Sequence, residues 1–275
     1  MKKVSIIKII LILFVLLAAA EANEPNAVSV NKTAIGGTGD SQELLRALAG
    51  AFEAKNSDCK IEVPDSIGSS GGIKALLRGD TNMARVAREL KDEEKAQGLT
   101  YQLFAKSPIV FVVNPSIADI NGITTEQIIG IYSGKITYWK QLGGGESKIY
   151  PITREPTDSS LQVLNKLLTG FEDTNSTVAK MIYTTPEAVK TLTEHKGTIG
   201  FVPLSMTIGT DLRILKIDGV YPSVENVSDG KYKFVTPFGI VYKGELRGLE
   251  KSFIEFLYSQ DGREIITEMG TVPAK

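Results

Sequence analysis

The chain has 275 residues, with 31 basic and 32 acidic residues, one cysteine and one histidine. This near-neutral balance excludes the basic face that nucleic-acid binding requires, so any site for an anion must be local. A lone Cys59 excludes an intramolecular disulfide and is best explained as a small buried hydrophobe, and one cysteine with one distant histidine cannot form a usual zinc site. We therefore expect no metal and no cofactor.

The N-terminus has the pattern of a secretory signal peptide. Three lysines within the first eight residues precede an apolar run, residues 9–20, which ends in the small-x-small pattern Ala20-Glu21-Ala22. The run is shorter than the roughly 20 residues that span a bilayer comfortably, which favours a cleaved leader over a membrane anchor. We expect residues 1–22 to be removed, which leaves 28 basic and 31 acidic residues on a periplasmic protein.

The first part of the mature chain alternates strands and helices. β-Branched and apolar segments predict strands at 28–35, 60–63 and 83–86. Apolar residues at helical spacing predict helices between these strands, at 44–52 and 73–77. This alternation is typical of an α/β fold with mostly parallel sheets.

A second region follows a continuous apolar strand at 109–113, which ends at Asn114-Pro115. The remaining predicted elements are a helix at 125–132, a strand at 148–152, a helix at 161–168, strands at 197–202 and 238–242, and a helix at 249–257. We detect no internal repeat, so the two regions are expected to be different α/β units.

Three predicted helices begin at loops rich in small polar residues: 37–41, 68–72 and 157–160. A helix N-terminus presents free N–H groups and a partial positive charge, and glycine lets an anion approach the backbone. Helix capping is the favoured explanation of each loop when it is considered alone. Three such loops together with Arg154, whose guanidinium fork suits an oxyanion, favour an anion-binding site.

An enzyme is the alternative of a different class. Gly68-Ser69-Ser70-Gly71-Gly72 satisfies the G-x-S-x-G pattern of a nucleophile elbow, and Asp158 and His195 follow in the order of α/β-hydrolases. Only one strand–helix unit precedes Ser70, however, and His195 lies in a charged turn. We therefore expect no enzyme, with a serine hydrolase as the less favoured hypothesis.

Several motifs resemble those of the phosphate-binding proteins of bacterial ABC transporters. Two family signatures match residues 68–74 and 88–94, a third matches 123–139, and 197–204 is similar to the family's GAIGYV strand. The resemblance extends from about residue 33 to the C-terminus. It implies a type II periplasmic-binding fold, in which two α/β lobes joined by crossing strands hold the ligand in a cleft, and delivery of that ligand to an inner-membrane permease without catalysis.

The chain departs from the family pattern in its loops. Asp158 enters the loop where the family commonly has GSGT, Asp40 enters the first loop, and Val86-Ala87-Arg88 lacks the family's serine and acid. Phosphate is the favoured ligand, and molybdate, tungstate, sulfate or a role as a non-transport anion sensor are the alternatives. Each acid either caps a helix or accepts the proton that phosphate carries and sulfate lacks, and we favour Asp158 for the second role.

We expect a monomer with lobe one at 27–112 plus 206–275 and lobe two at 113–205. The predicted ligand-binding residues come from both lobes: Thr38, Gly39, Asp40, Ser41, Ser69, Ser70, Gly71, Arg88, Arg154, Asp158, Ser159 and Ser160. An outward salt bridge explains Arg88 equally well.

Overall fold

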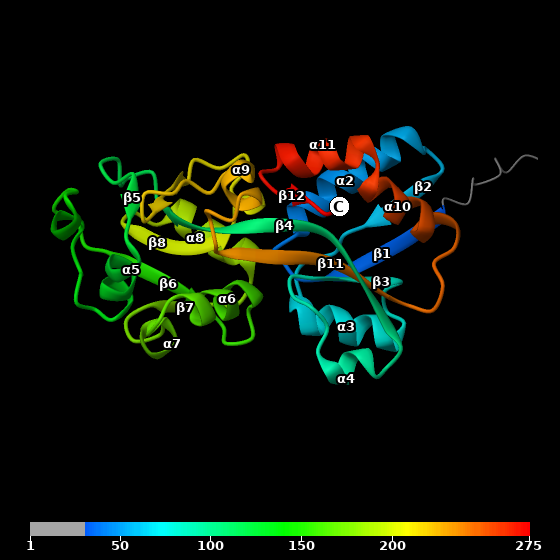
Figure 1. Cartoon of the computed structure of the whole chain (residues 1–275), viewed down its shortest axis with the longest axis horizontal. Coiled ribbons are helices and arrows are strands. Elements are labelled where there is room, and N and C mark those ends of the chain that lie inside the picture. Colours follow the sequence, from blue (N-terminus) through cyan, green and yellow to red (C-terminus); the bar gives the residue numbers. More distant parts are fainter. Residues whose placement is uncertain (1–30) are drawn as a thin grey trace, which may run out of the picture.

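The computed structural model describes residues 31–275, which form two lobes joined by two long strands (Figure 1). The predicted leader, residues 1–22, and the start of the strand predicted at 28–35 lie outside the described residues. Within the described part, no helix is both long and apolar enough to cross a membrane.

Lobe one is a mixed sheet with helices on both faces. Its strands are β1 (Asn31–Gly37), β2 (Cys59–Glu62), β3 (Met83–Val86), the first part of β4 (Leu99–Val113), β11 (Val235–Lys243) and β12 (Val272–Pro273). Its helices are α2 (Gln42–Lys55), α3 (Gly68–Arg78), α4 (Asp92–Lys95), α10 (Gly248–Tyr258) and α11 (Gln260–Glu268). β1 pairs in parallel with β2 and β3, while β11 runs antiparallel to β3 and β4.

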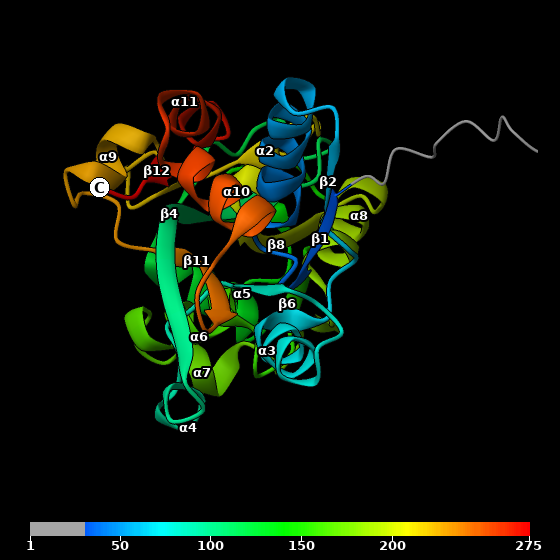
Figure 2. The ribbon, with the colours of Figure 1, turned by 90° about the vertical axis from the view of Figure 1, so that its right-hand side faces the viewer.

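The apolar periodicity of the helices decides which face of this sheet each one covers. α2, α10 and α11 lie together on one face, where Leu48 and Phe52 pack against Phe253, and α3 covers the other face (Figures 1 and 2). β1 ends against β3 so closely that a Cβ on Gly37, whose φ is +144°, would lie 2.0 Å from the carbonyl oxygen of Arg85. This close packing fixes the start of the loop that leads into α2.

Lobe two has the same layered arrangement around a second part of the sheet. Its strands are the end of β4, β5 (Gly122–Ile123), β6 (Tyr150–Arg154), β7 (Lys180–Ile182), β8 (Thr198–Pro203), β9 (Arg213–Ile214) and β10 (Lys216–Ile217). Its helices are α5 (Thr125–Tyr132), η1 (Trp139–Leu142), α6 (Ser159–Leu167), α7 (Phe171–Thr174), α8 (Thr185–Glu194), η2 (Leu204–Met206) and α9 (Val224–Ser228). β6 runs parallel to β7 and β8, and β8 runs antiparallel to β4.

Two apolar clusters hold lobe two together. On one face of the sheet, α5, α6 and α7 pack around Phe111, Tyr132 and Phe171, and the rings of Tyr132 and Phe171 meet edge to face with centroids 4.9 Å apart. On the other face, α8 packs through Leu192 against Val202. Both faces of these strands are therefore buried, as their continuous apolar sequences predict.

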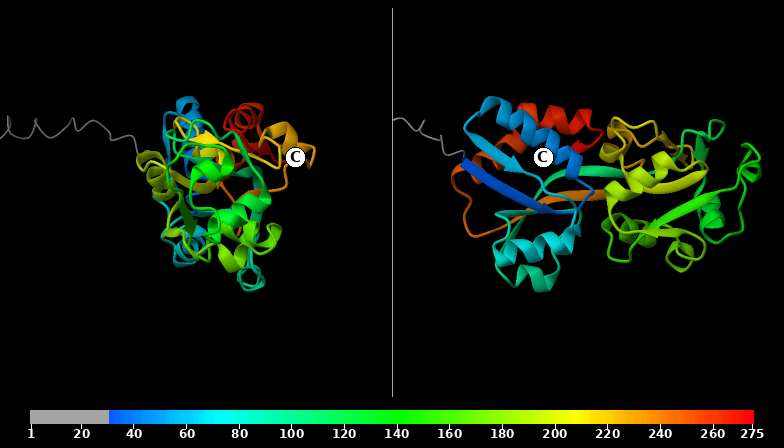
Figure 3. Two further views of the ribbon diagram at one scale, coloured as in Figure 1. Left: turned by 90° about the vertical axis from the view of Figure 1, so that its left-hand side faces the viewer. Right: turned by 180° about the vertical axis from the view of Figure 1, so that it is seen from behind.

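The two lobes share β4 and β11, which cross between them (Figure 3). β4 is a 15-residue strand whose first part pairs with β11 and whose last five residues pair with β8. The segment predicted at 109–113 is only the end of β4, because residues 99–108 mix polar with apolar residues and so lack the continuous apolar pattern. Apart from that, the predicted two-lobed α/β architecture is confirmed.

The sequence-based lobe boundary at 205/206 does not match the packing. Leu215, Ile217 and Tyr232 lie in the same buried cluster as Phe111, so the segment 206–234 packs on lobe two. The chain returns to lobe one only through β11. The strands of this segment, β9 and β10, have two residues each, which is too short for a periodic pattern to reveal.

Candidate functional site between the lobes

A small polar cavity of about 80 Å³ lies between the lobes, at the carboxyl ends of β1, β6 and β7. It is lined by Thr38, Gly39, Ser66, Ile67, Gly68, Ser69, Ser70, Gly71, Arg154, Glu155, Thr157, Asp158, Ser159, Tyr183 and Thr185. Both lobes therefore contribute walls, and hydroxyl groups, backbone and one guanidinium dominate the lining.

Helix N-termini meet at this cavity. α3 presents Gly68–Gly71, α6 presents Ser159 and α8 presents Thr185, while Thr38 and Gly39 lead into α2. The free N–H groups and partial positive charge at each helix start favour a bound anion. The glycine- and serine-rich stretch at 68–72, predicted as a loop, is in fact the first turn of α3.

Arg154 ends β6, and its side chain is only 4% exposed. Its Nε donates to the Ile182 carbonyl at 3.3 Å, and one terminal nitrogen donates to Thr185 Oγ1 at 3.0 Å. The other terminal nitrogen donates to the Tyr183 carbonyl at 3.3 Å and lies 2.9 Å from Asp158 Oδ2. These contacts hold the guanidinium rigidly at the cavity wall.

Asp158 caps α6, because its Oδ1 accepts the Leu161 N–H at 2.9 Å. Burial, which outweighs the opposing effect of Arg154 and is aided by nearby Asp40, raises the pKa of Asp158 to about 7. Both Asp158 oxygens are thus engaged by groups of lobe two itself.

Asp40 has a different environment. It is fully buried in lobe one, yet its Oδ1 accepts from Thr185 Oγ1 at 2.6 Å and its Oδ2 accepts from Ser160 Oγ at 3.1 Å, both in lobe two. It does not cap α2, which begins at Ser41 without a side-chain cap. The Asp40 carboxylate therefore links the lobes beside the cavity.

Further contacts show that the lobes touch at this point. Ser69 Oγ lies 3.3 Å from Ser159 Oγ across the cleft. A Cβ on Gly39 would lie 2.8 Å from Pro186 Cδ and 3.0 Å from Ser66 Oγ, so a side chain there would force the lobes apart. Gly39 thus permits the close approach of lobe two to the first loop.

The structure brings most of the predicted ligand residues together. Eight of them line the cavity: Thr38, Gly39, Ser69, Ser70, Gly71, Arg154, Asp158 and Ser159. Asp40 and Ser160 bond to each other beside it, and the fully buried Ser41 Oγ has no hydrogen-bond partner in the described part of the chain. A buried hydroxyl without a partner needs an explanation, and a ligand contact supplies one. The ligand roles of these residues stay a prediction.

The side-chain contacts of Arg88 lie within lobe one. Arg88 does not line the cavity; both terminal nitrogens pair with Glu94 at 2.7 Å, and one also reaches Ser70 Oγ at 3.2 Å. The sequence allowed Arg88 either a ligand contact or a salt bridge that points to solvent. The geometry supports a salt bridge, with Glu94, but this pair is partly buried.

Sequence reasoning missed Ser66, Tyr183 and the start of α8. The signal was present in Thr184-Thr185-Pro186, because threonine at the N-cap followed by proline in the first turn marks a helix start. Thr184 Oγ1 accepts the Glu187 N–H at 3.3 Å, as this pattern predicts.

The hydrolase hypothesis does not fit this geometry. Asp158 is paired with Arg154, and Ser70 is bonded by Arg88. His195 follows the last residue of the ten-residue α8, about 15 Å along the helix from Thr185 at the cavity. The three residues therefore do not form a triad. The described residues also contain no group of three or more potential metal ligands.

Comparison with known proteins agrees with this architecture. A model of the PBP superfamily domain matches residues 22–261. The phosphate-binding protein PstS of Borreliella burgdorferi is 28% identical over 98% of this chain and 99% of its own length, and PstS of Bacillus subtilis is 31% identical over 87% of this chain and 79% of its own length.

A solved structure from Clostridium perfringens, described as a phosphate ABC transporter substrate-binding protein with bound phosphate, has a TM-score of 0.79 and 30% identity. The similarity covers 89% of this chain and 100% of that one. The predicted resemblance is confirmed: the chain belongs to the PBP superfamily and is a relative of the PstS phosphate-binding proteins.

Proposed function

We propose that this protein captures phosphate between its two lobes and presents it to an ABC transporter. The observation that supports this function best is the convergence of the buried Arg154 guanidinium with the starts of α3, α6 and α8 at one small cavity. Phosphate is the first candidate ligand, because two relatives are named phosphate-binding proteins and a similar solved structure contains bound phosphate.

Binding follows from the charges and donors around the cavity. Arg154 supplies a charge-assisted hydrogen bond, and hydroxyls such as Ser69, Ser159 and Thr185 supply further donors. Because the donors belong to both lobes, an oxyanion favours the arrangement in which the lobes touch. The cavity is too small for a large organic substrate, which fits a compact inorganic anion.

The carboxylate that selects phosphate over sulfate is, in this proposal, that of Asp40. At neutral pH phosphate retains at least one proton, which an ionised carboxylate can accept, whereas sulfate has none to donate. The sequence favoured Asp158 for this role, but both of its oxygens serve Leu161 and Arg154. Asp40 is held only by hydroxyl groups, of Thr185 and Ser160, which can turn toward a ligand.

The proposal includes export and delivery. A leader at residues 1–22 would direct the protein to the periplasm, where it would act as a monomer. A permease in the inner membrane would receive the ligand from the closed form.

Calorimetric titration tests this function. The mature protein is freed of ligand by unfolding and refolding, and is then titrated with phosphate, sulfate, molybdate and tungstate. We expect phosphate to bind at least tenfold more tightly than sulfate, the difference that one charge-assisted hydrogen bond of about 1.5–3 kcal/mol produces. If another oxyanion binds more tightly than phosphate, that oxyanion is the ligand. If none of the four gives saturable binding, the proposal is refuted.

A further inference from the structure

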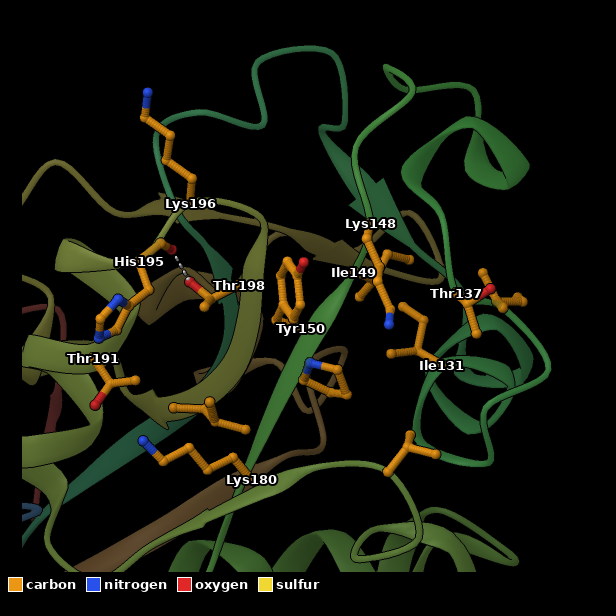
Figure 4. A pocket seen from close by; sticks show the side chains of 14 residues that line it. Ile131, Thr137, Lys148, Ile149, Tyr150, Lys180, Thr191, His195, Lys196 and Thr198 are labelled. Atoms are coloured by element: carbon orange, nitrogen blue, oxygen red, sulfur yellow. Dashed lines mark hydrogen bonds between the residues drawn. The ribbon is translucent and has the colours of Figure 1, made fainter.

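A second pocket, of about 570 Å³, lies at the opposite end of the lobe-two strands from the oxyanion cavity. It opens where β6, β7 and β8 begin, at Tyr150, Lys180 and Thr198, whereas the oxyanion cavity lies where β6 and β7 end. We call it the distal pocket; its walls come from α5, β6, β7, α8 and the turn at 195–198 (Figure 4).

The floor of the distal pocket is apolar. Ile131, Ile149 and Ile152 line it and are at most 3% exposed, whereas Tyr150 and Val178 at its rim are each 51% exposed. Its volume falls in the roughly 300–1,000 Å³ range of small-molecule sites, which are lined mostly by apolar side chains with a few polar groups. A bare inorganic anion would leave this floor uncovered, so the distal pocket suits a ligand with an apolar body.

The charges around the distal pocket all have one sign. Its lining includes Lys148, Lys180, His195 and Lys196 and no acidic residue. Among the described residues, none of these lysines has a carboxylate within 4.0 Å. Figure 4 shows Lys148 and Lys180 lying along the pocket and Lys196 extending away from it; Lys148 Nζ lies 5.8 Å from the centroid of the Tyr150 ring.

The C-terminus of α8 also borders the distal pocket, and its partial negative charge would oppose an anion. Its last carbonyls are already bonded, however. Asn114 Nδ2 donates to the carbonyls of Leu192 at 2.8 Å and Thr193 at 2.9 Å, and Thr198 Oγ1 donates to that of His195 at 2.7 Å. The lysines therefore dominate the electrostatics of this pocket.

We propose that the distal pocket binds an organic monocarboxylate with an apolar acyl or aryl body. The body lies on the floor formed by Ile131 and Ile152 beside the Tyr150 ring, and the carboxylate is attracted by Lys148 and Lys180, which border the pocket on two sides (Figure 4). This site is separate from the oxyanion cavity, and occupation of one does not require the other.

The test compares three probes that share one alkyl chain and differ in head-group charge: octanoate, octanol and octylammonium. Each is titrated into ¹⁵N-labelled protein saturated with phosphate, and amide shifts are followed by NMR. We expect octanoate to bind most tightly, with its shifts confined to residues near 149–152 and 191–198. Octylammonium binding as tightly as octanoate, or octanoate shifts scattered over both lobes, would overturn the proposal.

Matched lysine variants locate the carboxylate. Lys148→Gln combined with Lys180→Gln should weaken octanoate about fivefold, the loss expected for two partly exposed charge pairs, and should leave octanol unchanged. Lys196→Gln removes the same charge from a side chain directed away from the pocket and should change octanoate affinity less than twofold. Phosphate affinity should stay the same in all of these variants.

The opposite results are also clear. Equal octanoate affinity in the double variant and in the wild-type protein would show that the lysines do not recognise the acid. Sedimentation as a dimer that octanoate dissociates would identify a second copy of the chain as the occupant and would likewise overturn the proposal.

Discussion

Each lobe has a buried arginine near the oxyanion cavity, Arg85 in lobe one and Arg154 in lobe two. The two side chains have different partners. Arg85 is fully buried and donates to the backbone carbonyls of Ile35, Thr38 and Pro64, the last two at 2.7 Å. Within the described residues it has no carboxylate at ion-pair distance. Arg154 instead pairs with Asp158, contacts the Thr185 hydroxyl and lines the cavity.

The difference indicates a structural role for Arg85 in lobe one and agrees with the recognition role proposed for Arg154 in lobe two. Burial lowers the pKa of Arg85 to about 10, so the side chain is still protonated at neutral pH. Its charge is stabilised by carbonyl oxygens of the segments that carry Thr38 and Ser66 to the cavity. Arg85 therefore links the lobe-one segments that carry Thr38 and Ser66 to the cavity, whereas Arg154 lies in the lobe-two wall of the cavity, where we propose that it binds the ligand.

The largest effect is expected from Arg85→Met, which keeps much of the side-chain volume but removes every donor. Two buried carbonyl oxygens, of Ile35 and Thr38, lose a donor, and each loss costs about 1–3 kcal/mol, so the free energy of unfolding should fall by about 2 kcal/mol or more. Urea denaturation followed by circular dichroism measures this change.

Arg78→Met is the control for Arg85→Met. Arg78 forms an exposed ion pair with Asp80, so its loss should cost less than about 1 kcal/mol. Equal stability of the Arg85 and Arg78 variants would show that Arg85 does not hold the first loop.

The second prediction concerns Arg154 in lobe two and the affinity for phosphate. Arg154→Met should weaken phosphate binding about 10- to 100-fold, through the loss of about 1.5–3 kcal/mol of charge-assisted hydrogen bonding. Calorimetric titration beside Arg78→Met provides the measurement and its control; unchanged phosphate affinity would remove Arg154 from the site.

The sequence predicted the starts of α2, α3 and α6 and singled out Arg154, because these features depend on local rules. Small polar residues before a helix and a guanidinium after a strand are visible in single short windows. The sequence did not reveal the structural role of Arg85, because that role depends on long-range contacts. Its acceptors Ile35 and Thr38 lie 50 and 47 residues away along the chain. The assignment of lobe two failed for the same reason, since the segment 206–234 packs by distant contacts and not by its own pattern.

The distinction between the two acids likewise needed the tertiary structure. Asp158 lies at the N-cap of α6, which the sequence could suggest, but the contacts of Asp40 with Ser160 and Thr185 join residues 120 and 145 positions apart. No local pattern predicts which acid faces the other lobe.

A third prediction separates these acids by ligand selectivity. Asp40→Asn should reduce the ratio of phosphate to sulfate affinity about tenfold, because an amide can donate to sulfate and no longer repels it. Asp158→Asn is the matched control, and its ratio should stay within about twofold of wild type if Asp158 is a cap. Paired titrations with the two anions give both ratios; a change in the Asp158 variant alone would return the selecting role to Asp158.

The smallest effect concerns the pH dependence of stability and tests the environment of Asp158. Its folded-state pKa is raised from 3.8 to about 7 by burial, so between about pH 4 and pH 7 the folded protein binds a proton that the unfolded chain has released. This raised pKa contributes stability at the acidic end of that window, which is lost progressively as the pH rises through it. Asn also caps helices well, so Asp158→Asn should keep the cap and lack the titration.

The melting temperature of Asp158→Asn should therefore rise steadily relative to wild type between pH 5 and pH 8, as the wild-type protein loses this contribution. Thermal scans of ligand-free protein at unit pH steps measure the difference. Asp65→Asn removes a carboxylate that is 97% exposed and serves as the surface control. A melting-temperature difference that falls as the pH rises would mean that the ion pair with Arg154 outweighs burial. The pKa of Asp158 would then lie below its ordinary value, and Arg154 would stabilise the charged carboxylate.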